Sequence, residues 1–368
     1  MTILLISHTA NMDGAERTLL SLATSLHEHE HSCIVMCPTY GPLVNELTKR
    51  SVPVVIRLLP RPQRNLFFFI RFVLLWPFVV LYLAIWISKN DINFVINNTV
   101  DALYGPFAAK LAGAPCLWHI HEIKPKHSVV RAFFSWMFQV FSQNTVFNSK
   151  ATMLAYNSKM PANWHVIYNG IDIPKHKISN ATKRNCIVIG FAGQLVQLKR
   201  PDRFVYAVAA AKKKVSNLSA IIAGEGELFD QVKDLIATYS LSDSVKMLGY
   251  VEFMPDFYNQ IDILVLTSDT EAFGRVLIEA MAAGCPVVAA KVDGVPEVVD
   301  ETCGYLVPPD DIKAYAEKIV LLSQDADLRH RLGNTGRKRA IELFSESKFL
   351  EQMINLISNH NVVNTLPN

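Results

Sequence analysis

The 368-residue sequence lacks several features that would define its class at once. Its six cysteines (33, 37, 116, 186, 285 and 303) show no paired metal-ligand spacing. Only 19% of the residues are charged and the net charge is +3, with no accompanying nucleic-acid-binding motif, so no nucleic-acid partner is expected. Met1–Ser7 lacks the basic start of a signal peptide and predicts a buried strand. These absences favour a reduced, cytoplasmic setting.

Half of the residues are hydrophobic, and they form short strand-like runs that alternate with helical patterns. This alternation predicts an α/β protein with parallel sheets covered by helices on both faces. The length favours two domains, and the polar stretch 174–185 is the predicted linker. We therefore expect two doubly wound, Rossmann-like domains facing each other across a cleft, at residues 1–173 and 174–344. The predicted strands are 3–7, 33–37, 54–58, 94–97, 117–120 and 166–168 in the first domain, and 187–192, 220–223, 245–248, 263–267 and 287–290 in the second.

The most informative segment runs from Glu271 to Glu279. The preceding residues 262–267 predict a buried strand, and residues 274–283 have the apolar spacing of a helix that stops at Gly284. Glu271 then lies in the loop and Glu279 about a turn and a half into the helix. Free N–H groups at the start of a helix suit a phosphate, and a carboxylate can accept hydrogen bonds from two vicinal hydroxyls. The segment therefore fits a diphosphate ligand with a diol at one end.

In this context the Glu-x7-Glu spacing resembles the signature of glycosyltransferase family 4, the retaining GT-B enzymes. Seven further motifs of the chain are similar to that family in sequence order: 13–16, 119–122, 169–172, 193–199, 223–227, 249–251 and 294–297. Each motif alone is weak, but together they cover nearly the whole chain. The resemblance implies the GT-B fold, with a last helix at about 345–360 that packs back on the first domain.

The resemblance also implies roles for individual residues. Glu271 would be the acid of the sugar site, His121 would lie nearest to the transferred sugar or acceptor hydroxyl, and Lys199 would neutralise the diphosphate. The implied donor-binding residues are Glu279, Gly274, Phe273, Arg275, Gln194, Arg200, Gly14, Val251 and Gly224. A nucleoside diphosphate sugar would be the substrate, with no cofactor and no catalytic metal.

Some of these assignments have structural alternatives. Gln194 stands where the family usually has arginine, so either Arg200 or Arg275 compensates or phosphate affinity is reduced. Glu279 and Lys199 could instead be solvated surface residues. His119 and His121 fall on one face of a strand by period-two geometry, with Glu122 on the other. Both histidines, and His119 in particular, could instead be core residues that hydrogen-bond to the backbone.

A second unusual segment, residues 66–87, is apolar on every face and contains one charge, Arg71. The 16 residues after Arg71 give about 24 Å of helix, short of the roughly 30 Å core of a bilayer. A span would also separate residues 1–64 from the rest of their sheet. We therefore expect this segment and the basic, aromatic stretch 124–141 to lie in a membrane surface. A fully buried helix and a partner-protein surface are the alternatives.

The predicted function is a retaining glycosyltransferase that moves a sugar from a UDP- or GDP-sugar to a glycan or lipid-linked acceptor. The expected setting is bacterial surface polysaccharide synthesis, with the protein peripherally attached to the inner face of the plasma membrane. The charge balance agrees with this attachment, because residues 1–173 hold 14 Lys and Arg against 9 Asp and Glu. The alternatives are a nucleotide-sugar 2-epimerase of the same architecture and a catalytically silent subunit of a glycan-assembly complex.

Overall fold

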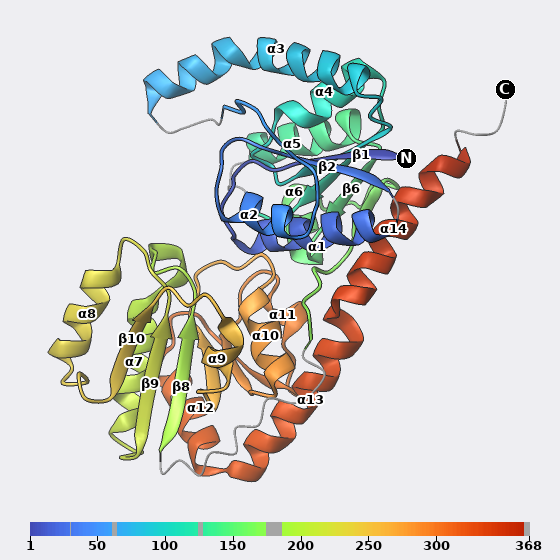
Figure 1. Ribbon diagram of the computed structural model, residues 1–368. Helices are drawn as coiled ribbons and strands as arrows, with labels where there is room; N and C mark the ends of the chain where they lie inside the picture. The colour runs from blue at the N-terminus through green and yellow to red at the C-terminus, as the bar shows by residue number, and fades with distance from the viewer. Residues whose placement is uncertain (30, 61–64, 124–127, 174–185, 364–368) are drawn as a thin grey trace. The chain divides into compact units, whose positions relative to one another are not determined.

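The computed structural model describes residues 1–29, 31–60, 65–123, 128–173 and 186–363, and it divides the chain into two compact units. Unit 1 consists of Met1–Gly170 together with Glu346–Asn368, and unit 2 is Ile171–Ser345. The predicted linker 174–185 lies outside the described residues. Figure 1 shows the elements of both units.

Unit 1 contains a seven-stranded parallel sheet in the order β3-β2-β1-β4-β5-β6-β7. Its strands are β1 (Thr2–Ile6), β2 (Ser32–Cys37), β3 (Val54–Ile56), β4 (Phe94–Asn98), β5 (Cys116–Ile120), β6 (Asn144–Phe147) and β7 (Trp164–Val166). Its helices are α1 (Gly14–Glu28), α2 (Pro42–Lys49), α3 (Leu66–Lys89), α4 (Tyr104–Ala112), α5 (Ser128–Phe141), α6 (Lys150–Tyr156) and α14 (Glu346–Val363).

Alternate residues of β1 pack against helices on opposite faces of the sheet of unit 1. Ile3 and Leu5 share one buried cluster with side chains of α1, α2 and α14. Leu4 and Ile6 share another with side chains of α3 and α4, and α5 and α6 pack in a third cluster around Trp118. This period of two is the geometry of a strand that is buried on both faces.

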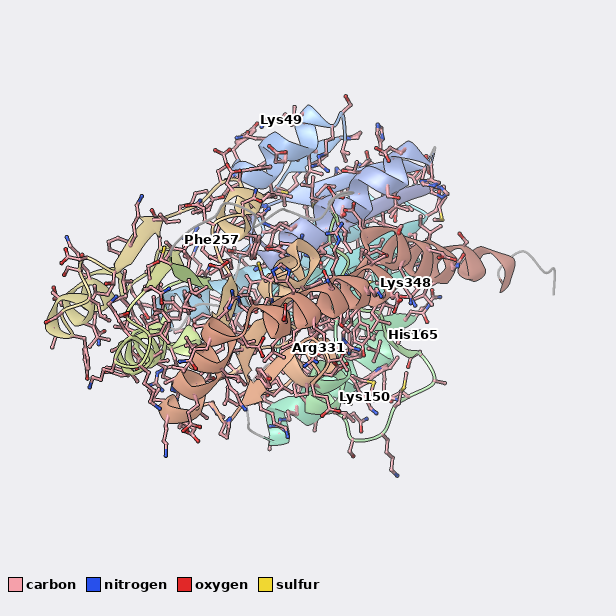
Figure 2. All side chains as sticks on the ribbon, turned by 90° about the horizontal axis from the view of Figure 1, so that it is seen from below. Lys49, Lys150, His165, Phe257, Arg331 and Lys348 are labelled. Atoms are coloured by element: carbon pink, nitrogen blue, oxygen red, sulfur yellow. The ribbon has the colours of Figure 1, made fainter. Side chains whose placement is uncertain are left out.

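Unit 2 contains a six-stranded parallel sheet in the order β10-β9-β8-β11-β12-β13. Its strands are β8 (Ile187–Ala192), β9 (Leu218–Ala223), β10 (Val245–Gly249), β11 (Ile263–Leu266), β12 (Val287–Ala290) and β13 (Gly304–Val307). Its helices are η1 (Gln197–Lys199), α7 (Pro201–Lys212), α8 (Phe229–Thr238), α9 (Met254–Tyr258), α10 (Arg275–Ala283), α11 (Val295–Val298), α12 (Ile312–Gln324) and α13 (Ala326–Phe344). Phe257 of α9, labelled in Figure 2, is fully buried.

Both sheets are doubly wound and parallel, as predicted, but the sequence analysis missed two strands. β6 (NTVF) and β13 (GYLV) have only four residues each, and they begin with Asn144 and Gly304, which are weak strand formers. The strand expected at 166–168 is displaced toward the N-terminus, to Trp164–Val166.

The chain passes twice between the units, at neighbouring points. Ile171 forms a parallel bridge with Ser345 in unit 2, and its N–H donates to the carbonyl of Phe344 at 2.9 Å. In unit 1, a Cβ on Gly170 would lie 2.6 Å from the Cα of Glu346. Only glycine allows so close an approach of two backbones at this position.

Candidate functional site

Most of the predicted donor-binding residues follow the carboxyl ends of strands in unit 2. Gln194 and Lys199 follow β8, Gly224 follows β9, Val251 follows β10, and Glu271 follows β11. Carboxyl ends of parallel strands meet at one edge of a sheet, and this edge is where doubly wound folds bind ligands. The fold thus brings residues from four separate sequence motifs to one edge.

The loops after β8 and β9 are in backbone contact. Gly193 N–H donates to the carbonyl of Ala223 at 3.0 Å, and Leu195 N–H donates to the carbonyl of Glu225 at 2.8 Å. Gly224 has a φ of 144°, and a Cβ there would lie 1.9 Å from the carbonyl oxygen of Gly193. The close contact explains why the chain has glycine at this position, and it fixes the loop that carries Gln194.

Lys199 and Glu271, both predicted to be catalytic, form an ion pair in the structure. Lys199 Nζ lies 2.5 Å from Glu271 Oε2, and the hydroxyl of Ser268 lies 3.4 Å from the same oxygen. The backbone of Glu271 is also held, because its N–H donates to Asp293 Oδ2 at 3.0 Å. An ammonium group beside a carboxylate can hold a phosphate and a sugar hydroxyl next to each other.

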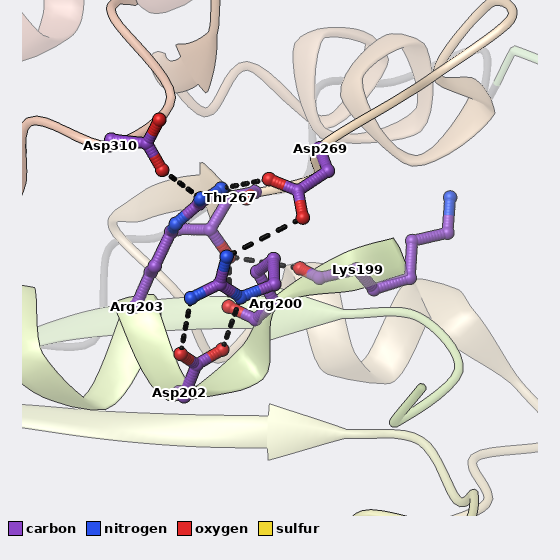
Figure 3. A network of polar contacts seen from close by, with 7 residues as sticks. All are labelled: Lys199, Arg200, Asp202, Arg203, Thr267, Asp269 and Asp310. Atoms are coloured by element: carbon purple, nitrogen blue, oxygen red, sulfur yellow. Dashed lines mark hydrogen bonds and ion pairs between the residues drawn. The ribbon is translucent and has the colours of Figure 1, made fainter. Parts of the chain in front are cut away.

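A network of charged residues holds the loops that carry this pair (Figure 3). The side chain of Arg203 is buried and contacts Asp269 Oδ1 at 2.5 Å and also Asp310. Arg200 donates to Asp202 at 2.8 Å and to Asp269 at 3.4 Å. Arg203 therefore links the segments that follow β11 and β13 near the Lys199 and Glu271 pair.

The same network includes the hydroxyl of Thr267, which links the end of β11 to the backbone at Lys199 and Arg200. Thr267 Oγ1 donates to the carbonyl oxygens of Lys199 at 3.1 Å and Arg200 at 2.8 Å. Arg200 is in the left-handed region, with a φ of 49°. The ion pair with Asp202 raises the pKa of the Arg200 guanidinium above its usual range. The turn from η1 into α7 is thus tied directly to the end of β11.

Glu279 is the fifth residue of α10, and both of its oxygens have partners. The phenol of Tyr258 donates to Oε2 at 2.8 Å, and Arg275 Nε donates to Oε1 at 2.8 Å. Burial, and then the negative charge of Glu279, raise the pKa of Tyr258 well above 10, so its phenol stays protonated and donates. These two donors orient a carboxylate whose remaining lone pairs can accept from vicinal hydroxyls.

Gly274 precedes α10 in the left-handed region, with a φ of 88°, and Phe273 is buried against Phe344 with ring centroids 5.7 Å apart. A Cβ on Gly274 would lie 2.9 Å from Leu277 and 3.4 Å from Glu271. Glycine here starts the helix beside Glu271, which leaves the first N–H groups of α10 at this edge.

The two arginines expected to compensate for Gln194 are engaged elsewhere. Arg200 is paired with Asp202 and Asp269, and Arg275 is paired with Glu279. In this conformation both guanidinium groups therefore neutralise protein carboxylates. Compensation by either arginine stays a prediction, since it would require these ion pairs to rearrange.

In unit 1 the polar side chains gather at the carboxyl ends of β1, β4 and β5. His121 Nε2 lies 2.9 Å from Asn98 Oδ1, and its Nδ1 lies 3.2 Å from the amide nitrogen of Asn169. This pattern fits a neutral ring that donates through Nε2 and accepts at Nδ1. Burial, then the neighbouring His119 and His8, lower the pKa of His121 well below 6.5.

The rings of His119 and His121 lie 4.0 Å apart, which confirms that they share a face. Asn98 also donates to the carbonyl of Ala15 at 3.4 Å, which places His121 near Gly14 at the start of α1. Asp13 occupies the N-cap position of α1 but makes no capping side-chain hydrogen bond. His121 is therefore a buried residue with two amide partners, and its proposed role next to the sugar stays a prediction.

Sequence reasoning missed the residues that orient these groups. Tyr258, Asp293 and Asn98 each contact a candidate residue, at separations of 21, 22 and 23 positions in the chain. Arg203 contacts the carbonyl of Thr267 across 64 positions. No local sequence pattern marks contacts of this kind, because the fold alone brings the partners together.

His8 was missed in the same way. Its Nδ1 lies 3.3 Å from the buried Glu16 and 3.2 Å from the hydroxyl of Thr99. Thr99 directly follows β4, so this contact joins the segments after β1 and β4 beside His121.

Two surface hollows lie away from these residues. One, of about 270 Å³, lies beside Ser242–Lys246, and the other, of about 580 Å³, lies beside Ser51–Arg57. Neither is lined by a candidate site residue. Among the described residues, no group of three His, Cys, Asp or Glu side chains is placed to hold a metal ion.

Several solved structures share this architecture. An Anabaena protein, Alr3699/HepE in complex with UDP and glucose, is 24% identical with a TM-score of 0.82, covering 97% of this chain and 99% of that one. A mutant of TarM from S. aureus, in complex with Fondaparinux, alpha-GlcNAc-glycerol and UDP, is 15% identical with a TM-score of 0.74, covering 97% and 99%. These likenesses confirm the predicted GT-B fold.

Sequence relatives point to the same group of proteins. The capsular polysaccharide biosynthesis glycosyltransferase CapM of Staphylococcus aureus is 28% identical over 59% of this chain and 56% of its own length. The UDP-Gal:alpha-D-GlcNAc-diphosphoundecaprenol alpha-1,3-galactosyltransferase of Escherichia coli is 24% identical over 85% of this chain and 86% of its own. The first three curated relatives are matched over 56%, 41% and 38% of their lengths.

Two family models match adjoining parts of the chain. Residues 12–175 match Glycosyltransferase Family 4, and residues 172–339 match Glycosyl transferases group 1. Together they span residues 12–339, which include the candidate residues of both units. The chain therefore belongs to glycosyltransferase family 4.

Proposed function

We propose that the protein is a retaining glycosyltransferase that moves a sugar from a nucleoside diphosphate sugar to a glycan or lipid-linked acceptor in bacterial surface polysaccharide synthesis. The observation that carries the proposal is the Lys199 and Glu271 pair, 2.5 Å apart at the carboxyl edge of the second sheet, next to the start of α10. UDP is the favoured nucleotide, because UDP is bound in the HepE and TarM structures. GDP remains the alternative nucleotide.

In the proposed reaction the donor diphosphate replaces Glu271 as the ion-pair partner of Lys199. The lysine and the N–H groups of α10 then hold the departing diphosphate, while Glu271 accepts from hydroxyls of the sugar. Glu279, oriented by Tyr258 and Arg275, accepts from the ribose hydroxyls. A leaving phosphate oxygen helps to deprotonate the acceptor hydroxyl on the same face of the sugar, so the configuration is retained. Positioning and electrostatics would supply most of the rate.

Thermal shift with a panel of UDP- and GDP-sugars tests the donor site. Binding to the folded state raises the melting temperature, and one nucleotide should do so in wild type. Glu279→Ala should reduce that shift strongly. The control is Glu317→Ala, which should not reduce it, because Glu317 is an exposed glutamate on α12 whose carboxylate lies 3.9 Å from Lys313. No shift with any donor would contradict the proposal and favour a silent subunit.

Product analysis distinguishes transfer from isomerisation. A transferase releases the nucleoside diphosphate and yields a glycosylated acceptor. A 2-epimerase converts the donor without an acceptor, and that result would overturn the transferase assignment. We also infer that no metal takes part, on the strength of the family resemblance alone, so EDTA should leave the rate unchanged.

We further propose that the protein works in the cytoplasm, peripherally attached to the inner face of the plasma membrane. The support for this location is the polysaccharide-related relatives together with the basic, apolar character of residues 66–87 and 124–141. Cell fractionation should place the protein in the membrane pellet and release it at alkaline pH without detergent.

A further inference from the structure

Helix α3 of unit 1 is apolar both where it packs and where it is exposed. Phe72, Val80, Leu83 and Ile87 are buried, and Leu83 is one of the side chains that share a cluster with α4. A surface helix normally has polar residues on its other face. Here the other face consists of Ile70, Val73, Leu74, Phe78, Leu81, Tyr82 and Ile85, all exposed, with Phe78 at 71%.

Helix α5 continues this surface. Val129, Phe133 and Trp136 recur at helical spacing and are 78%, 53% and 52% exposed. A chain of ring contacts joins the two helices across α4: Trp76 to Phe107 at 4.8 Å, Phe107 to Phe141 at 3.9 Å, and Phe141 to Trp136 at 5.8 Å. In Figure 1, α3 lies over α4 at the top of unit 1. We call the exposed residues of α3 and α5 the apolar face.

The length and composition of α3 alone would allow a membrane span. Ile70–Lys89 is the one helix among the described residues that is long and apolar enough, and only 28% of its most apolar window is buried. The sheet excludes a single crossing, because β3 before α3 and β4 after it belong to one sheet, in the order β3-β2-β1-β4. Both ends of α3 therefore lie on the same side of any membrane, and the helix can only lie along the surface.

The charged residues of α3 and α5 are all basic. Arg71 and Lys89 lie in α3 and Arg131 lies in α5, and neither helix contains Asp or Glu. Arg71 and Lys89, near the two ends of α3, are exposed, and so is Lys110, which lies over the ring of Phe141 at 5.0 Å. A second copy of this face would bring like charges together. A layer of anionic lipid headgroups would instead complement them.

We propose that the apolar face is a monotopic membrane-docking surface, in which α3 and α5 lie in the plane of an anionic leaflet. Leu74, Phe78 and Phe133 enter the boundary between headgroups and acyl chains, and the basic side chains contact lipid phosphates. Tyr82 and Trp136 sit at headgroup level, where amphipathic rings are favoured. A lipid-linked acceptor would then reach the protein from the side of unit 1 that carries the apolar face. Only this assignment of the acceptor's entry side rests on the proposed function.

Vesicle flotation with the full chain tests the surface. Wild type should float with vesicles of phosphatidylglycerol and phosphatidylcholine, and less with phosphatidylcholine alone. The double variant Leu74→Glu, Phe78→Glu should lose at least tenfold of the bound fraction, because two apolar side chains leave the interface and two negative charges replace them. Leu321→Glu, an exposed helical leucine of unit 2, is the matched control and should float as wild type does.

Two further readouts keep the result unambiguous. The UDP-induced melting shift should be the same in every variant, which shows that the protein is folded and separates a failed docking surface from a failed donor site. Light scattering without vesicles should give a monomer. Wild type that stays out of both vesicle types would overturn the proposal. A wild-type dimer that dissociates in the double variant Leu74→Glu, Phe78→Glu would also overturn the proposal, because a second copy of the chain would then cover the apolar face.

Discussion

Two buried histidines make unit 1 sensitive to acid. His119 is 1% exposed, and burial lowers its pKa from 6.5 to about 3, while His121 is shifted in the same direction. Between these values the unfolded chain binds a proton that the folded chain does not. The contribution of these two neutral histidines to the free energy of unfolding is therefore fully present above about pH 6.5, and it decreases as the pH falls below that value.

The loss can be measured by chemical denaturation at pH 7.5 and pH 5.5. Each buried histidine should lower the free energy of unfolding by about 1.4 kcal/mol over this interval. His119→Gln should reduce the pH dependence by about that amount. An unchanged pH dependence in His119→Gln would show that this histidine takes up its proton over the same pH range in the folded and the unfolded chain.

Tyr258 contacts Glu279, so we expect it to influence donor binding through that carboxylate. Tyr258→Phe removes the 2.8 Å hydrogen bond to Glu279 Oε2 but keeps the ring. A hydrogen bond to a charged group contributes about 1.5 to 3 kcal/mol, so the KM for the donor should rise by roughly tenfold with kcat little changed. Tyr239→Phe, an exposed phenol on the same unit, is the control. An equal fall in kcat and kcat/KM would instead indicate a role in the transition state.

At the residue scale, the sequence predicted the groups but not their partners. The Glu-x7-Glu spacing made Glu271 and Glu279 candidate site residues, since both lie within one loop and helix. Tyr258 and Asn98 could not be identified, because their contacts with Glu279 and His121 join residues 21 and 23 positions apart. The pairing of Arg275 with Glu279 is a local i, i+4 contact, and the sequence did suggest Arg275 as a donor-site residue.

At the scale of elements, substitutions at two glycines can distinguish the cost of backbone strain from the cost of a steric clash. Gly193 and Gly224 have similar φ values, 152° and 144°, in adjoining loops. A Cβ on Gly193 would meet nothing within 4 Å, whereas a Cβ on Gly224 would meet the carbonyl oxygen of Gly193 at 1.9 Å.

Alanine at each position should therefore have different effects. Gly193→Ala should cost only the strain of a rare conformation, about 1–3 kcal/mol, while Gly224→Ala should cost more and also displace the loop that carries Gln194. Melting temperatures and donor affinities of the two variants provide the measurement. Equal effects on donor affinity would mean that the loop contact does not shape the site.

The sequence also predicted most elements, and the misses have physical causes. Long apolar runs such as Ile187–Ala192 were located to the residue, because they are buried on both faces. β6 and β13 were missed because four residues give little periodicity and their neighbours in the sheet, rather than their own composition, make them strands. The packing of α3 was beyond the sequence, since every face of that helix is apolar and no pattern marks the buried one.

At the scale of the whole molecule, α14 completes the core of unit 1. Phe349, Met353 and Ile357 are buried in the same cluster as β1, and the ring of Phe349 stacks on His119 at 6.0 Å. Phe349→Ala should therefore destabilise unit 1 by about 3–5 kcal/mol.

Calorimetry should report this as a lower melting transition for unit 1, with the UDP-dependent transition of unit 2 unchanged. Glu351→Ala, an exposed position on the same helix, should have no measurable effect. If both transitions fall together in Phe349→Ala, the two units unfold as one cooperative body.

Because α14 follows unit 2 in the sequence, the two units also have an order of assembly on the ribosome. All seven strands of unit 1 are made before residue 170, but Phe349 and its neighbours are made only after unit 2. Unit 2, from Ile171 to Ser345, can complete its core while unit 1 still waits for a helix that has not been translated. Unit 1 therefore begins before unit 2 and is completed after it, and until then it exposes the apolar surface that α14 will cover.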